Sequence, residues 1–235
     1  MLEAALWGLV GGLGLVIGAL IAFALRPSKR TIAYVMAFGA GVLISAVAFD
    51  LTEEALELGG GPPVGAGLAA GALVYYFGDR LLRRMRPGGR SEEADDPQGL
   101  VLGALLDGIP ESAAIGLTLI SGGGVSGSFV AAVFISNLPE SIPASAELES
   151  RHPRRAIVGL WLAIAIASAI AAALGYVLLK DASGDWAAFV KAFAGGAILC
   201  MLTNTMIPQA FRDGGDRVGL VTVLGFALAA LLSAA

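Results

Sequence analysis

The sequence predicts an all-α membrane protein, an eight-transmembrane-helix bundle with little of the chain outside the bilayer. Two observations support this fold class. The first is composition, because 57% of the 235 residues are hydrophobic and only 14% are charged. So few polar side chains cannot cover the surface of a water-soluble domain of this size. The second is a series of charge-free runs of roughly 20 residues, the length that crosses a hydrocarbon core of about 30 Å.

The chain is expected to form one transmembrane domain over residues 1–235. Four glycine-rich positions, Ser121 to Gly124, predict a turn that divides one long apolar stretch into two helices. Residues 83–97 contain four acids beside several arginines, which predicts a solvated cytoplasmic loop. The predicted spans are residues 4–25, 31–50, 60–80, 99–120, 127–148, 156–179, 187–210 and 217–234.

The basic residues predict the orientation of the bundle. Of the 15 Lys and Arg residues, only Lys180 and Lys191 fall outside the connections between spans 1 and 2, 3 and 4, 5 and 6, and 7 and 8, or the helix ends beside them. Short loops rich in Lys and Arg remain in the cytoplasm. We therefore expect a multi-pass protein of the cell membrane with both termini outside the cytoplasm.

A short polar motif occurs twice in the middle of the chain. Asp107-Gly-Ile-Pro-Glu-Ser112 is followed 29 residues later by Ser136-Asn-Leu-Pro-Glu-Ser141. Each copy lies near the middle of a predicted span, the fourth and the fifth. Since consecutive spans run antiparallel, the two copies are expected at the same depth in the membrane.

The residue types in this repeat suit a divalent cation. Asp107 and Glu111 are four residues apart and share a helix face, as do Ser136 and Glu140. A proline within a helix also frees the carbonyl four residues before it. An intramembrane charge costs at least about 2.5–3.5 kcal/mol, so these acids are either protonated or compensated by a cation. Carboxylate, amide and carbonyl oxygens are hard ligands. The candidate metal ligands are Asp107, Glu111, Asn137 and Glu140, with Ser136 as a further candidate.

Other polar residues give weaker signals. Asp50 and Glu54 end the second span and are candidates for the ion pathway, although an ordinary polar helix end explains them equally well. The acids of the repeat have a packing interpretation as well, in which they hydrogen-bond neighbouring helices. His152 lies in a basic loop and is expected at the surface. Cys200 is the only cysteine, so no intramolecular disulfide can form.

At the duplicated motif the sequence resembles the ZIP family of divalent metal transporters. The resemblance implies a ZIP-like bundle of eight spans with both termini outside and metal ligands in the fourth and fifth spans. Pro110-Glu111 and Pro139-Glu140 match the family motif, and Asn137 fits a ligand position. Asp107 replaces the usual histidine. The sixth predicted span has no charged residue, so a second metal site is not expected.

The expected function is inward transport of zinc, manganese or iron(II), with the metal as substrate and no cofactor. Two alternatives stay open: a proton-coupled carrier of another cation, and a metal-binding membrane protein that does not transport. An enzyme is not expected, because the nucleophile and zinc motifs of intramembrane proteases are absent. The expected partners are the metal ion and the lipid bilayer, without nucleic acid. A homodimer stays open.

Overall fold

The structure is a computed structural model that describes residues 1–85, 97–119 and 126–233, and within these ranges it is entirely helical apart from short connections. The all-α prediction is confirmed for this part of the chain. Most of the predicted 83–97 loop and the Ser121–Gly124 turn lie outside the described residues. The α-helices are α1 (Leu2–Leu25), α2 (Lys29–Ala46), α3 (Glu54–Gly59), α4 (Gly61–Met85), α5 (Pro97–Thr118), α6 (Gly127–Leu148), α7 (Arg154–Leu179), α8 (Gly184–Met201), α9 (Ile207–Gly214) and α10 (Val218–Ser233).

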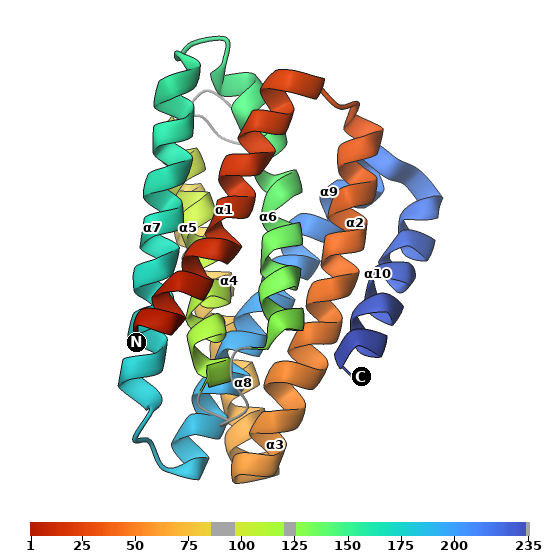
Figure 1. Ribbon diagram of the computed structural model, residues 1–235. Coiled ribbons are helices and arrows are strands. Elements are labelled where there is room, and N and C mark those ends of the chain that lie inside the picture. Colours follow the sequence, from red (N-terminus) through yellow and green to blue (C-terminus); the bar gives the residue numbers. More distant parts are fainter. Residues whose placement is uncertain (86–96, 120–125, 234–235) are drawn as a thin grey trace.

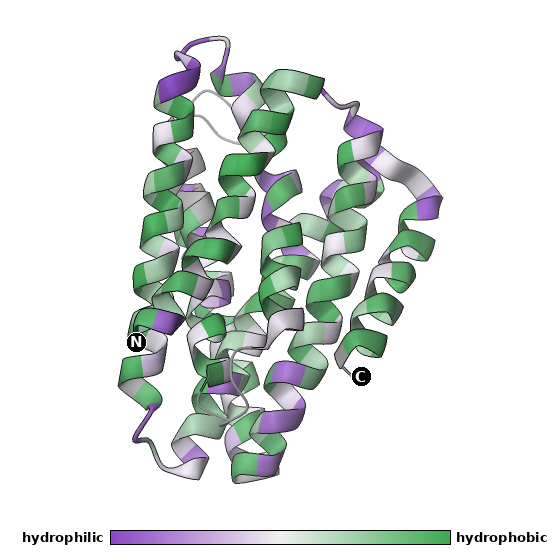
Figure 2. Cartoon of the chain, in the orientation of Figure 1, coloured by the Kyte–Doolittle hydropathy of each residue, from purple (hydrophilic) through white to green (hydrophobic). Residues whose placement is uncertain are grey.

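The helices form an elongated bundle (Figure 1). Four described segments are long and apolar enough to cross a membrane: Leu2–Leu25, Lys29–Gly59, Arg154–Val177 and Gly184–Leu232. Figure 2 shows apolar residues along the shafts of the helices and hydrophilic residues gathered mainly towards their ends. A helical membrane protein agrees with these features, while the count of eight spans remains a prediction.

The second predicted span is longer than residues 31–50. Ser28 caps its start, where the side-chain oxygen accepts a hydrogen bond from the Thr31 amide. The helix then continues through a π-helical segment, η1 (Val47–Glu53), into α3. The buried residues Leu51 and Ala55 extend its apolar face beyond the predicted end. The chain finally turns at Gly60, whose φ of 71° suits glycine.

The seventh predicted span is built in the same way. Helix α8 continues through a second π-helical segment, η3 (Leu202–Met206), into α9, and the chain turns at Gly215 with φ 70°. The short 3₁₀ segment η4 (Gly215–Arg217) then leads into α10.

These two regions form an internal structural repeat, because each residue of the first corresponds to the residue numbered 155 higher. A β-carbon built on Gly59 would contact Ala188, and one built on Gly214 would contact Ala33. Both pairs are related by the same shift, with the roles of the two halves exchanged. Helix α3 packs on α8, and correspondingly α9 packs on α2.

The third helix of each half follows a similar relation, although corresponding residues of α4 and α10 are 154 apart and not 155. Gly71 of α4 lies against the Phe193 carbonyl, and Gly225 of α10 lies against the Phe38 carbonyl. Accordingly α4 packs mainly on α8, and α10 packs mainly on α2. The repeat is also visible in the sequence, where Ala-Tyr-Val-Met-Ala-Phe at 33–38 matches Ala-Phe-Val-Lys-Ala-Phe at 188–193.

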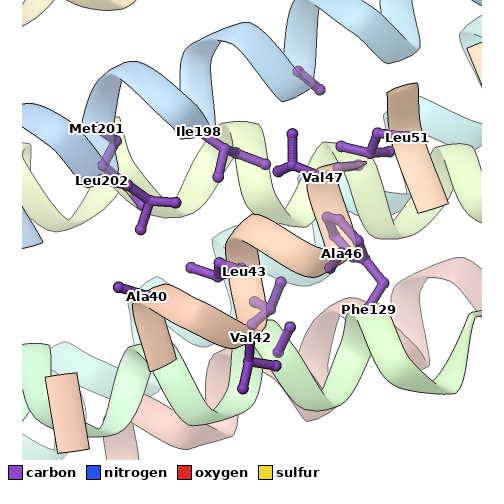
Figure 3. Close-up of a cluster of buried hydrophobic side chains, with 14 of the residues drawn as sticks. Ala40, Val42, Leu43, Ala46, Val47, Leu51, Phe129, Ile198, Met201 and Leu202 are labelled. Carbon is purple, nitrogen blue, oxygen red and sulfur yellow. The ribbon is translucent and has the colours of Figure 1, made fainter. Parts of the chain in front are cut away.

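The main apolar core lies where the two halves meet (Figure 3). Leu43 and Val47 come from the second span, and Ile198 and Leu202 are their counterparts 155 residues later. Phe129 of α6 joins this cluster and is fully buried. The core therefore connects the duplicated halves to the pair α5 and α6, which contain the Pro-Glu motifs.

Candidate functional site

Contacts of helix α1 show where the two motifs lie along the length of the bundle. A β-carbon on Gly11 would lie 3.0 Å from Ile115 of α5 and 3.2 Å from Val133 of α6. Glu111 is one helical turn before Ile115, and Asn137 is one turn after Val133. Since α5 and α6 run in opposite directions, both residues are displaced towards the same end of the bundle, by about 6 Å. The two copies of the motif thus lie at a common level.

The helices that contain the motifs remain continuous. Pro110 lies inside α5, and both Pro139 and Pro143 lie inside α6. Prolines are tolerated in membrane helices because neighbouring helices and hydroxyl side chains satisfy the freed backbone groups. The Ser141 hydroxyl lies 3.3 Å from the carbonyl oxygens of both Asn137 and Leu138 and can donate to them. These are not the carbonyls of Ile135 and Pro139 that the two prolines of α6 free.

Glu111 is the most deeply buried acid of the motifs, with an exposed fraction of 1%. Glu140 is partly buried. Asp107 belongs to α5, but its side chain lies outside the described part of the structure. The side chains of two of the three predicted acidic ligands, Glu111 and Glu140, are therefore described. Whether all three acids converge on one ion stays a prediction.

Asn137 connects the second motif to α1. Its side-chain nitrogen donates a hydrogen bond of 3.0 Å to the Gly11 carbonyl, and its exposed fraction is 3%. Close approach of α1 is possible because Gly14 lies against the Phe134 carbonyl and Gly18 against Leu138. The amide nitrogen thus has a packing role, and the amide oxygen is the atom that remains for a metal. Its role as a ligand stays a prediction.

Hydroxyl groups line the same region. Ser136 is fully buried and donates a hydrogen bond of 2.9 Å to the Val133 carbonyl, so its oxygen can still accept or coordinate. Ser168 of α7 was not among the predicted residues, yet it is buried. Its hydroxyl lies 4.0 Å from the position of a β-carbon at Gly108. A lone serine in an apolar span gives no signal in the sequence, so only the packing of α7 on α5 reveals it.

Among the described residues, no group of three or more His, Cys, Asp or Glu residues is close enough to hold a metal ion. The side chain of Asp107 is outside that search. The ligand set of the central site therefore remains a prediction from the duplicated motif.

Asp50 and Glu54, the predicted pathway residues, lie near the start of α6, the end opposite its connection to α7. Asp50 accepts a hydrogen bond of 2.7 Å from the Ser126 hydroxyl and a longer one from Ser128. Ser126 precedes Ser136 by ten residues, which corresponds to about 15 Å along the helix. The two pathway candidates therefore lie well away from the central motifs.

Glu54 forms an ion pair with Lys191 of α8, a residue that the sequence interpretation did not include. Lys191 is 1% exposed, whereas the Glu54 side chain is 31% exposed. The match of residues 33–38 with 188–193 could have identified it, because Lys191 is the one charged residue in either segment.

The chain matches no protein-family model. A protein of Arabidopsis thaliana named "Putative zinc transporter" is 29% identical to it over 182 residues, which cover 74% of this chain. The chain spans 29% of the length of that relative.

Proposed function

We propose that this chain is an eight-span carrier of the ZIP type that moves a divalent metal cation into the cytoplasm. The metal binds between α5 and α6 at the level of the two Pro-Glu motifs. Asp107, Glu111, Asn137 and Glu140 are its ligands, and Ser136 can contribute a further oxygen. The similarity to a relative named as a zinc transporter supports transport of a metal ion.

The burial of Glu111 is the observation that carries this proposal. A carboxylate with 1% exposure sits in α5, a helix whose sequence from Pro97 to Thr118 contains no Lys or Arg. Ionising such a group within a membrane is costly unless a cation compensates it. A second carboxylate, Glu140, occupies the equivalent position of the duplicated motif. Together the two glutamates carry the charge that neutralises one divalent ion.

The proposed ligands are all oxygen atoms. Zinc favours nitrogen and sulfur ligands, whereas manganese accepts oxygen sites. Manganese and iron(II) are therefore expected to compete well with zinc. A proton-coupled carrier of another cation would use Glu111 or Glu140 as the proton acceptor. A metal-binding protein without transport would bind the ion and not pass it on.

The test is metal uptake into proteoliposomes that contain the purified chain. Glu111→Gln and Glu140→Gln retain side-chain size and remove the charge, so each is expected to abolish most manganese uptake. Melting temperatures in detergent should remain near that of the unmodified chain. Glu147→Gln is the matched control, because Glu147 lies on α6 with an exposed side chain, and its uptake should be unchanged. Normal uptake by both motif variants would show that these acids serve packing.

A further inference from the structure

Three charged side chains lie near one another at one end of the bundle, and we refer to Asp50, Glu54 and Lys191 as the charged triad. The Lys191 ammonium group of α8 pairs with Glu54 of α3. Asp50 lies within electrostatic reach of both, repelled by Glu54 and attracted by Lys191. Hydroxyl groups of Ser126 and Ser128 at the start of α6 hold Asp50 in place. The triad has a net charge of −1 when all three groups are ionised.

The internal repeat indicates that the packing of α3 on α8 does not require charged side chains. By the shift of 155, Asp50 corresponds to Thr205, Glu54 to Gln209, and Lys191 to Met36. Helix α9 packs on α2 at the other end of the bundle as α3 packs on α8 here, with these neutral residues in place of the triad. The chain thus contains the same helix crossing twice, and only one of the two crossings has charged side chains.

Stability does not explain the charged version. Removing an ammonium group from water carries a desolvation penalty, and replacing a buried ion pair by neutral residues is often neutral or stabilising. The packing of α9 on α2, where the corresponding residues Met36 and Gln209 are neutral, forms within the same chain. The triad therefore calls for a functional explanation.

The arrangement suits a competition between cations. The Glu54 carboxylate is partly exposed, while the Lys191 ammonium behind it is almost completely buried. An ion that arrives from water reaches Glu54 first, and the Glu54 carboxylate is already paired with the single positive charge of Lys191. A divalent ion interacts with Asp50 and Glu54 twice as strongly as a monovalent ion at the same distance. The triad thus favours divalent ions over monovalent ones.

We propose that the Lys191 ammonium group pairs with Glu54 until the transported divalent ion replaces it at this carboxylate. The charged triad is then the entrance of the pathway, and it selects divalent ions. This inference rests on the proposed function. In the predicted orientation the triad faces the outside, and its neutral counterpart faces the cytoplasm. Attraction at one end only favours capture of the ion outside and its release inside.

The neutral half of the repeat supplies the test variants. Lys191→Met inserts the residue found at Met36 and leaves two uncompensated carboxylates. Manganese binding is measured by titration of the purified chain in detergent, in a Glu111→Gln/Glu140→Gln background that removes the proposed central ligands. Lys191→Met is expected to bind manganese at least about tenfold more tightly than this background alone. Adding Glu54→Gln should abolish the gain.

A variant with all three residues replaced, Asp50→Thr/Glu54→Gln/Lys191→Met, keeps the test valid if Lys191→Met alone does not fold. It copies the other end of the bundle and should have a melting temperature near that of the unmodified chain. With the central glutamates intact, its apparent KM for manganese uptake should rise at least about tenfold. An unchanged KM in this variant, or no gain of binding in folded Lys191→Met, would overturn the inference. Absence of uptake by the unmodified chain would instead overturn the proposed function, because the binding titration does not depend on transport.

Discussion

At the scale of single residues, burial separates the polar side chains into groups with different roles. Glu111 and Lys191 are both 1% exposed, but they occupy different levels of the bundle. Trp161 shows the structural use of a buried polar group, since its indole nitrogen donates to the Ser145 hydroxyl at 2.8 Å. Such a pair is fully satisfied within the protein and needs no ligand. The carboxylates at the level of the duplicated motif are the groups that we propose as metal ligands.

We propose that Asp107 influences metal preference, because it stands at the position where the ZIP motif that the sequence resembles usually has histidine. Asp107→His replaces a hard oxygen ligand by an imidazole nitrogen, which suits zinc. We expect the ratio of zinc uptake to manganese uptake to rise at least about tenfold, since first-row metals differ strongly in their preference for nitrogen. Competition between the two metals in proteoliposomes measures this ratio. An unchanged ratio would place Asp107 outside the set of ligands.

The sequence was informative about these residues only where a pattern repeated. The duplicated Pro-Glu motif predicted Glu111 and Glu140 as ligands. The structure shows that Glu111 is buried, and the role of both residues as ligands stays a prediction. Ser168 and the partners of Asp50 could not be foreseen, because single serines are common in apolar helices. Lys191 is different, because its segment matches residues 33–38 and the sequence therefore contains a signal for it.

At the scale of helices, glycines determine how closely neighbours approach. Gly41 of α2 lies directly against the Thr222 carbonyl of α10, and Gly196 of α8, its counterpart, lies against the Leu68 carbonyl of α4. Small residues at such crossings are a common basis of helix packing in membranes. The partners of these glycines depend on the tertiary arrangement and are not visible in the sequence. The two π-helical segments were also missed, because no simple residue pattern marks them.

Gly41→Ala is expected to destabilise the bundle, since the new methyl group would overlap the backbone of α10. Overpacking typically costs about 1–3 kcal/mol, and backbone atoms cannot move aside as a side chain can. The melting temperature in detergent should fall by several degrees. Gly65→Ala is the matched control on α4, because a β-carbon there has no neighbour within 4 Å. It should retain or slightly raise stability through its better helix propensity. Equal melting temperatures for the two variants would contradict the close crossing of α2 and α10.

At the scale of the whole molecule, the repeat relates two similar segments that differ in charge, because only one of the two crossings contains the charged triad. The second span and the seventh share their glycine turns, their π-helical segments and their core positions. Composition and the series of charge-free runs predicted the helical bundle, because they report how much apolar surface the chain has and how it is divided along the sequence. They could not predict the repeat, whose halves have diverged at most positions while keeping small residues at the crossings.

The distribution of basic residues between the two ends of the bundle predicts its orientation in the membrane. Figure 1 shows the α1–α2, α6–α7 and α9–α10 connections at one end of the bundle and the α3–α4 and α7–α8 connections at the other. The first group contains basic residues such as Arg26, Arg155 and Arg217, which favours a cytoplasmic location. The charged triad then faces the outside, as required for capture of an external ion.

Cysteine labelling in intact cells tests this orientation in a Cys200→Ala background. Single cysteines at Ser150 and Asp216 should be shielded from an impermeant thiol reagent, and cysteines at Gly61 and Asp181 should react. These positions are exposed and lie in connections or at a helix end, and they avoid Gly60 and Gly215, whose positive φ would strain a cysteine. Permeabilised cells are the control, because all four cysteines should then react. Labelling of Ser150 and Asp216 variants in intact cells would reverse the orientation, and the triad would then face the cytoplasm.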